Sequence, residues 1–146
     1  MNDITQLTVN SLGAAADDNG IDLDGRCLLT RPDGIDEWVE TKRLSWLMDN
    51  GYDLSVDLDS ATPWLHAVAT NMAIVPNERW NEADFSWIAK ALQPGSPTNP
   101  LTFWQLQEPP LPVTFAFRTM NGASGIFRLT AYSKKEKTAA IEIKTA

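Results

Sequence analysis

The fold class of this chain is decided by one stretch near its C-terminal end, Val113-Thr114-Phe115-Ala116-Phe117-Arg118. Large apolar residues alternate there with small or polar ones, which is typical of a β-strand with one buried face. A turn at 120–122 leads to a second strand-like segment over 125–132, and a lysine-rich turn leads to a third over 138–144. These residues predict a three-stranded antiparallel meander.

The middle segment of the meander alternates less regularly than its neighbours. Its pattern places Ile126 and Tyr132 on one face. It places Phe127 and Leu129 on the other face, because successive side chains of a strand point to opposite sides.

Two further strand signals lie upstream of the meander. Tyr52–Leu58 alternates apolar and acidic residues, which predicts a half-buried strand whose aspartates face water. The segment Ile21–Thr30 indicates two short strands joined by a tight turn at Asp24-Gly25, a dipeptide that suits positive φ. Residues 64–75 leave helix and strand open, although Met72–Val75 before Pro76 favours a strand end.

Residues 35–50 give the clearest helical pattern. Four apolar residues fall on one face of such a helix: Ile35, Trp38, Val39 and Trp46. Asp33 is the expected N-cap, and Asn50-Gly51 supplies a residue suited to the left-handed end of a helix.

A second helix is expected over 82–92, with Asn81 as its cap. Its apolar stripe consists of Phe85, Ile88, Ala89 and Leu92, and Trp87 points the other way.

The combined prediction is an α+β domain. An antiparallel sheet from the meander and Tyr52–Leu58 is expected to be covered on one face by the two amphipathic helices. The chain is expected to be a single domain over 1–146, loosely ordered over 1–20. The proline-rich residues 93–112 are expected to form an extended surface connection.

Composition excludes several classes of function. The 19 acids and 12 bases give a net charge of −7, which disfavours binding to nucleic acid or to an anionic membrane surface. No stretch approaches the length needed to insert into a bilayer. The single cysteine excludes an intrachain disulfide. The chain reads as soluble and cytoplasmic as written, and as extracytoplasmic if it is a fragment of a membrane-anchored protein; its oligomeric state stays open.

Several acidic residues are candidate cation ligands. If Gly25 takes the sixth position of a calcium loop, Asp22 and Asp24 fall at ligand positions, but Gly20 and Arg31 occupy the first and twelfth. Asp57, with its neighbouring aspartates, offers a second weak group. The favoured interpretation is solvated carboxylates, so no metal and no cofactor are expected, and Asp22, Asp24 and Asp57 are the weak candidates.

No catalytic residue is assigned. Cys27 is the only cysteine and His66 the only histidine, so a four-ligand zinc site is excluded by count. Cys27 precedes two leucines, which favours a buried structural thiol over a Cys–His pair. No serine lies in a Gly-x-Ser-x-Gly elbow.

Six tryptophans are many for 146 residues. Exposed aromatic side chains suit stacking on a sugar, a peptide or a partner protein, whereas a tryptophan-rich core is the simpler alternative for each. The candidate binding residues are Trp87, Trp64 and Trp104, with Trp87 foremost because it lies off the expected apolar face.

Three stretches also resemble a family. These are Ile21–Pro32, Asp49–Asp53 and Pro112–Tyr132, the last with the motifs Phe115-Ala116-Phe117-Arg118-Thr119 and Gly125-Ile126-Phe127-Arg128-Leu129. They resemble, in the same order, a poorly characterised bacterial module of large membrane-associated regulators and proteases, for which no activity is established. The chain departs from that pattern at Gly25 and at Met120-Asn121. The resemblance implies a sensory or interaction module of a longer chain.

Three functions follow as hypotheses. The first is a non-catalytic sensory or interaction module that binds a protein or a small ligand. The second is a small hydrolase that uses a carboxylate pair, with Asp22 and Asp24 beside Asp57, which would need a concave pocket and two acids in unequal environments. The third is a purely structural domain.

Overall fold

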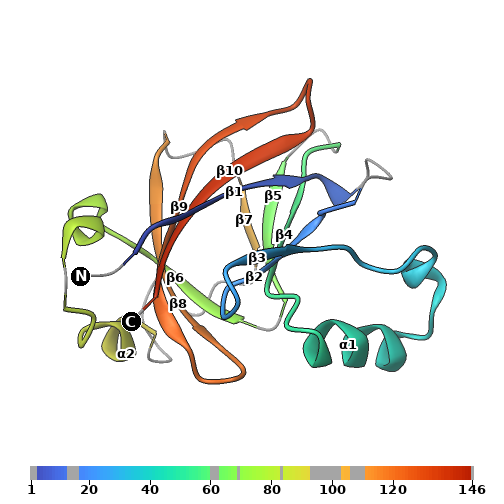
Figure 1. Ribbon diagram of the computed structural model, residues 1–146, viewed down its shortest axis with the longest axis horizontal. Helices are drawn as coiled ribbons and strands as arrows, with labels where there is room; N and C mark the ends of the chain where they lie inside the picture. Colours follow the sequence, from blue (N-terminus) through green and yellow to red (C-terminus); the bar gives the residue numbers. More distant parts are fainter. Residues whose placement is uncertain are drawn as a thin grey trace.

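The computed structural model describes residues 3–12, 17–59, 63–68, 70–82, 84–92, 103–105 and 111–145. Its strands form two antiparallel sheets, which lie against each other in Figure 1. The first sheet has the order β1-β10-β9-β8-β6, with β1 Thr5–Asn10, β6 Thr70–Val75, β8 Val113–Thr119, β9 Ser124–Ser133 and β10 Thr138–Thr145. The second has the order β3-β2-β4-β5-β7, with β2 Gly20–Asp22, β3 Cys27–Leu29, β4 Leu54–Asp57, β5 Trp64–Ala67 and β7 Phe103–Gln105.

The two sheets pack face to face around one apolar core. Each sheet contributes the inward residues of its strands, such as Leu54 and Val56 of β4 and Phe115 and Phe117 of β8, none of which is exposed to solvent. The rings of Phe115 and Phe127 stack with centroids 4.9 Å apart at the centre. Burial of this apolar area is the main force that holds the sandwich together.

The predicted fold class is therefore wrong: the chain is mostly β, and in its described residues no single sheet is covered by two amphipathic helices. The meander is present as β8, β9 and β10, but the strand predicted over 52–58 is β4 of the other sheet. Residues 64–75, left open by the sequence, form two strands, β5 and β6, one in each sheet.

The first predicted helix is shorter than its apolar pattern. A 3-10 turn, η2, spans Ile35–Glu37, and α1 begins at Glu40 and ends at Asp49. Val39 is extended at the start of α1 and is 69% exposed, so it does not share the buried face. The end agrees with the sequence, because Gly51 follows Asn50 with φ 69.

The second predicted helix is reduced to one turn, α2 Ile88–Ala91, preceded by the 3-10 turn η3 Asn77–Asn81. These two turns pack on the outer face of the first sheet, where Trp80, Phe85 and Ile88 cover Ala116 and Ile126. α1 packs by contrast beside the second sheet, and Figure 1 shows α1 and α2 at opposite flanks of the molecule.

The alternation of the middle strand is also wrong as predicted, because of a β-bulge. The register of β9 on β10 shifts between Ala140 and Ile141. An extra residue reverses the side to which later side chains point. Tyr132 therefore packs on the central core with Phe127 and Leu129. Ile126 lies on the outer face, without Tyr132 beside it.

The β2–β3 hairpin differs in its turn chemistry. It is closed by residues 23–26, and the positive φ falls on Arg26, at 51°. At Gly25 the constraint is one of space: a Cβ there would lie 2.7 Å from Asp22 Oδ2 and would displace that carboxylate. Its backbone N–H instead donates to Asp22 Oδ1 at 3.0 Å.

The segments expected to be loosely ordered or extended are described only in part. Within residues 1–20, β1 pairs with β10 along its full length. Of the proline-rich region, residues 93–102 and 106–110 lie outside the described residues, and 103–105 form β7. None of the helices in the described ranges is long and apolar enough to cross a membrane.

Candidate functional site

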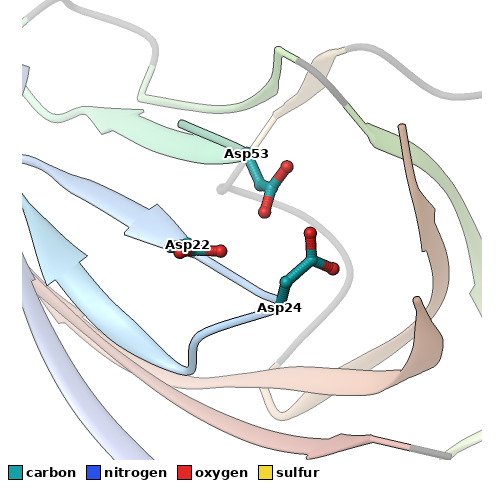
Figure 2. Close-up of side chains that lie close together, drawn as sticks. All are labelled: Asp22, Asp24 and Asp53. Atoms are coloured by element: carbon teal, nitrogen blue, oxygen red, sulfur yellow. The ribbon is translucent and has the colours of Figure 1, made fainter. Parts of the chain in front are cut away.

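Three carboxylates converge at one end of the sandwich. Asp22 ends β2, Asp24 lies in the β2–β3 turn and Asp53 directly precedes β4. One oxygen of each lies within 4.8 Å of the others, and Figure 2 shows the side chains turned toward a shared space. The antiparallel pairing of β2 with β4, which sets Ile21 opposite Leu54, brings these residues together.

Asp53 is the buried member, with 1% of its surface exposed. Its Oδ2 accepts a hydrogen bond from the Leu23 backbone N–H at 2.8 Å, and its Oδ1 accepts one from the Thr70 hydroxyl at 2.9 Å. Leu23 belongs to the hairpin of the second sheet and Thr70 begins β6 of the first. The Asp53 side chain therefore joins the two sheets.

Asp24 makes a second link of the same kind. Its Oδ1 accepts a hydrogen bond from the Thr119 hydroxyl at 2.6 Å, and its Oδ2 accepts one from the Asn121 amide at 3.2 Å. Thr119 ends β8 of the first sheet. Two carboxylates thus hold the β2–β3 hairpin against the first sheet.

Burial raises the pKa of Asp53 to about 6. The hydrogen bonds from Leu23 and Thr70 oppose this shift, and the negative charges of Asp24 and Asp22 add to it. Removal from water disfavours the ionised carboxylate, and nearby like charges do the same. Between about pH 4 and pH 6, Asp53 therefore retains a proton that a solvated aspartate would have released.

Six carboxylate oxygens in this space are the ligand type that Ca²⁺ and Mg²⁺ prefer. A bound dication would favour ionised Asp53. The hydrogen bonds that these carboxylates accept from Leu23, Gly25, Thr70 and Thr119 give them a structural role without any bound ion.

Asp57 does not belong to this group. It lies at the other end of β4 from Asp53, and the cluster unites Asp22 and Asp24 with Asp53 instead. The arrangement weighed for a hydrolase is therefore not assembled. The sequence pattern also placed Asp53 on the wet face of a strand, which is wrong, because Asp53 precedes β4 and turns inward.

Cys27 and His66 lie apart in the second sheet, on β3 and β5. Cys27 is exposed, which corrects the expectation of a buried thiol. Shielding from water by neighbouring atoms and the charge of Asp22 both raise the pKa of its thiol. Burial lowers the pKa of the His66 imidazole, so that the ring is neutral at pH 7.

Two of the three candidate tryptophans serve packing. Trp104 on β7 is 7% exposed and meets Phe115 edge to face, with centroids 5.4 Å apart, in the central core. Trp87 is half-buried beside α2, where its indole N–H donates to the Asp84 carbonyl at 3.0 Å. The Arg79 guanidinium lies 4.5 Å from the centroid of the Trp87 ring.

Trp64 is the candidate that faces solvent, with 36% of its surface exposed. It lies on the outer face of the second sheet, opposite Asp57 in the β4–β5 ladder. The neighbouring pair on this face is Ser55 and His66. These four residues and Leu12 line a pocket of about 390 Å³, which we call the Trp64 pocket.

The Trp64 pocket lies beside the apolar cluster under α1. Leu12 lines the pocket and also packs against the cluster formed by Ile35, Leu47 and Tyr52. The cluster under α1 reaches the second sheet through Leu29 of β3, and it shares Leu12 with the pocket. The sequence contained a signal for this site in the inward alternation of β4, which turns Ser55 and Asp57 outward.

Comparison of the chain with protein-family models, with curated proteins and with solved structures finds no match.

Proposed function

We propose that this chain is a non-catalytic binding module whose binding site is the Trp64 pocket. The observation that carries the proposal is the solvent-facing Trp64 indole beside two polar side chains, Asp57 and His66, in one hollow. Binding sites of proteins typically combine an aromatic or apolar wall with a few convergent polar groups, in volumes from about 300 Å³ upward.

Volume alone does not single out this pocket. Two other hollows have a similar size. One borders Trp87, and the other lies between Asn77 and Pro112. The lining of the former adds the basic residues Arg79 and Lys90 to Trp87. The Trp64 pocket differs in its lining, which combines an indole, a carboxylate and a neutral imidazole.

The cluster of Asp22, Asp24 and Asp53 is a weaker candidate for the binding site than the Trp64 pocket. Asp22, Asp24 and Asp53 bond to backbone and hydroxyl groups of their own chain and lie outside the lining of the best-defined pockets of the described residues. The resemblance to the bacterial module favours the same interpretation, that of a sensory or interaction module within a longer chain.

The test is NMR of the ¹⁵N-labelled chain, in which each tryptophan indole gives one signal and Trp64→Phe identifies that of Trp64. The chain is titrated with a panel of oligosaccharides and capped amino acids. We expect at least one member to shift the Trp64 signal and to bind at least about tenfold more weakly to Trp64→Ala, because stacking on an indole contributes on the order of 1 kcal/mol or more.

Trp87→Phe is the matched control, since it alters the other solvent-facing tryptophan pocket and should leave binding unchanged. A panel that never moves the Trp64 signal contradicts the proposal. Shifts that gather at the Trp87 signal contradict it equally and would place the site on the other flank.

A further inference from the structure

The chemistry of the Trp64 pocket points to one class of ligand. Asp57 and Trp64 are directly opposite each other in the antiparallel β4–β5 ladder. Such partners have Cβ atoms about 5 Å apart on the same face of the sheet. A carboxylate and an exposed indole therefore flank the same space.

The charge of the pocket is negative. Its five described lining residues include one acid, Asp57, and neither lysine nor arginine. His66 is neutral at pH 7 because burial lowers the pKa of its imidazole. Lys137, which lies close to this end of β4, is paired with Asp59 at 2.8 Å. The whole chain adds a net charge of −7, which attracts cations from a distance.

The Asp57 carboxylate retains capacity for a ligand. Its Oδ1 accepts a hydrogen bond from the Asp59 backbone N–H at 3.0 Å. An ionised carboxylate offers about four acceptor positions, so one such bond leaves others.

The chain itself pairs indoles with cations elsewhere. Lys42 lies 4.4 Å from the centroid of the Trp38 ring, and Arg128 and Lys144 each lie 4.4 Å from that of Trp80. The face of an indole attracts cations through its ring quadrupole, and guanidinium groups are the most frequent partners. An indole beside a carboxylate combines this attraction with a charge-assisted hydrogen bond.

We propose that the Trp64 pocket binds a guanidinium group, as carried by an arginine side chain of a partner protein, with the group stacked on the Trp64 indole and hydrogen-bonded to the Asp57 carboxylate. This inference rests on the function proposed above and names the ligand of that site. Arginine suits the pocket better than lysine because its planar guanidinium stacks on a ring and donates two parallel hydrogen bonds to a carboxylate.

The experiment compares capped arginine with capped citrulline, which has nearly the same shape and no charge, in the same NMR titration. We expect capped arginine to shift the Trp64 indole signal with a Kd on the order of 1 mM, as suits a single small group. Citrulline and Asp57→Asn should each weaken binding at least about tenfold, because a hydrogen bond to a charged group is lost.

Asp49→Asn is the matched control. Asp49 is exposed at the end of α1, and this substitution removes the same single charge from the chain. It should leave the affinity for arginine within about twofold, because Asp49 lies outside the lining of the pocket and salt screens the charge of an exposed side chain. Asp57→Asn retains Oδ1 as an acceptor for Asp59, so the local fold is preserved.

The outcomes separate the two proposals. If citrulline binds as tightly as arginine, or if Asp57→Asn binds arginine normally while Trp64→Ala does not, the pocket binds a ligand but the guanidinium inference is wrong. If neither capped amino acid nor any oligosaccharide moves the Trp64 signal, both proposals fail. Capped arginine that binds while an arginine-containing tripeptide is excluded would overturn a protein partner as the source.

Discussion

The Thr70 hydroxyl donates a hydrogen bond to Asp53 Oδ1 at 2.9 Å and so ties β6 of the first sheet to the loop that enters β4 of the second. The acceptor is a carboxyl group that is 1% exposed and whose pKa is raised to about 6. The hydrogen bond that joins the two sheets therefore ends on a carboxyl group that titrates.

This arrangement predicts a dependence of stability on pH. The folded pKa of Asp53 lies above its ordinary value of 3.8, so the fold favours the protonated form. The contribution of Asp53 is then fully present below pH 3.8 and is lost as the pH rises to about 6. Two pKa units correspond to about 3 kcal/mol in the free energy of unfolding.

Urea denaturation of wild type and Asp53→Asn from pH 4 to pH 7 measures this contribution. We expect the wild type to lose about 2 kcal/mol relative to the variant over this range, because asparagine does not ionise and because part of the full contribution is already lost at pH 4. EDTA is included, since a bound dication would ionise Asp53 and reverse the slope. Parallel pH profiles of the two proteins would show that the carboxyl is not buried as described.

The bond between Asp24 and Thr119 predicts a second effect on stability. Thr119→Val keeps the shape of the side chain and removes the hydroxyl that donates to Asp24 at 2.6 Å. We expect the free energy of unfolding to fall by about 1.5–3 kcal/mol, the range for a hydrogen bond to a charged group. Chemical denaturation at pH 7 provides the measurement.

Asn121→Ala is the comparison for Thr119→Val. Its amide donates to the same carboxylate at 3.2 Å, but in an exposed position. Substitutions at such sites usually change stability by no more than about 0.5 kcal/mol. Equal losses for the two variants would mean that the hairpin is not held through Thr119.

The exposed thiol of Cys27 predicts a chemical effect. The charge of Asp22 is one of two causes that raise its pKa. Asp22→Asn should lower that pKa and increase the thiolate fraction, and the thiolate is the reactive form. We therefore expect faster alkylation by iodoacetamide at pH 8 in Asp22→Asn than in wild type, read by mass spectrometry.

Asp36→Asn is the control for the alkylation rate. It removes the same charge from a residue that pairs with Arg31 and has no part in the shift at Cys27. Its rate should match that of the wild type. An unchanged rate in Asp22→Asn would show that shielding from water alone sets the pKa of Cys27.

Local sequence patterns are sufficient to predict the elements in which side-chain period and turn chemistry agree. The strand β8 alternates in side-chain size because Phe115 and Phe117 fill the central core, whereas Ala116 lies under the turns that cover the outer face. The end of α1 follows from Asn50-Gly51, where glycine adopts φ 69 at no steric cost. Counting residues excluded a disulfide and a four-ligand zinc site. The spacing of apolar side chains and the number of cysteine and histidine residues can be read without knowing which elements pack together.

Tertiary structure alone decided which strands share a sheet, how long the helices are and which polar groups meet. β4 carries the predicted alternation, yet the pairing of Ile21 with Leu54 assigns it to the second sheet. The bond between Asp24 and Thr119 spans 95 residues, and no local pattern encodes a contact at that separation. The sequence pattern predicted a solvated Asp53, because period-2 alternation indicates only on which face of a strand a side chain lies. Whether that side chain is buried depends on the sheet that packs against it.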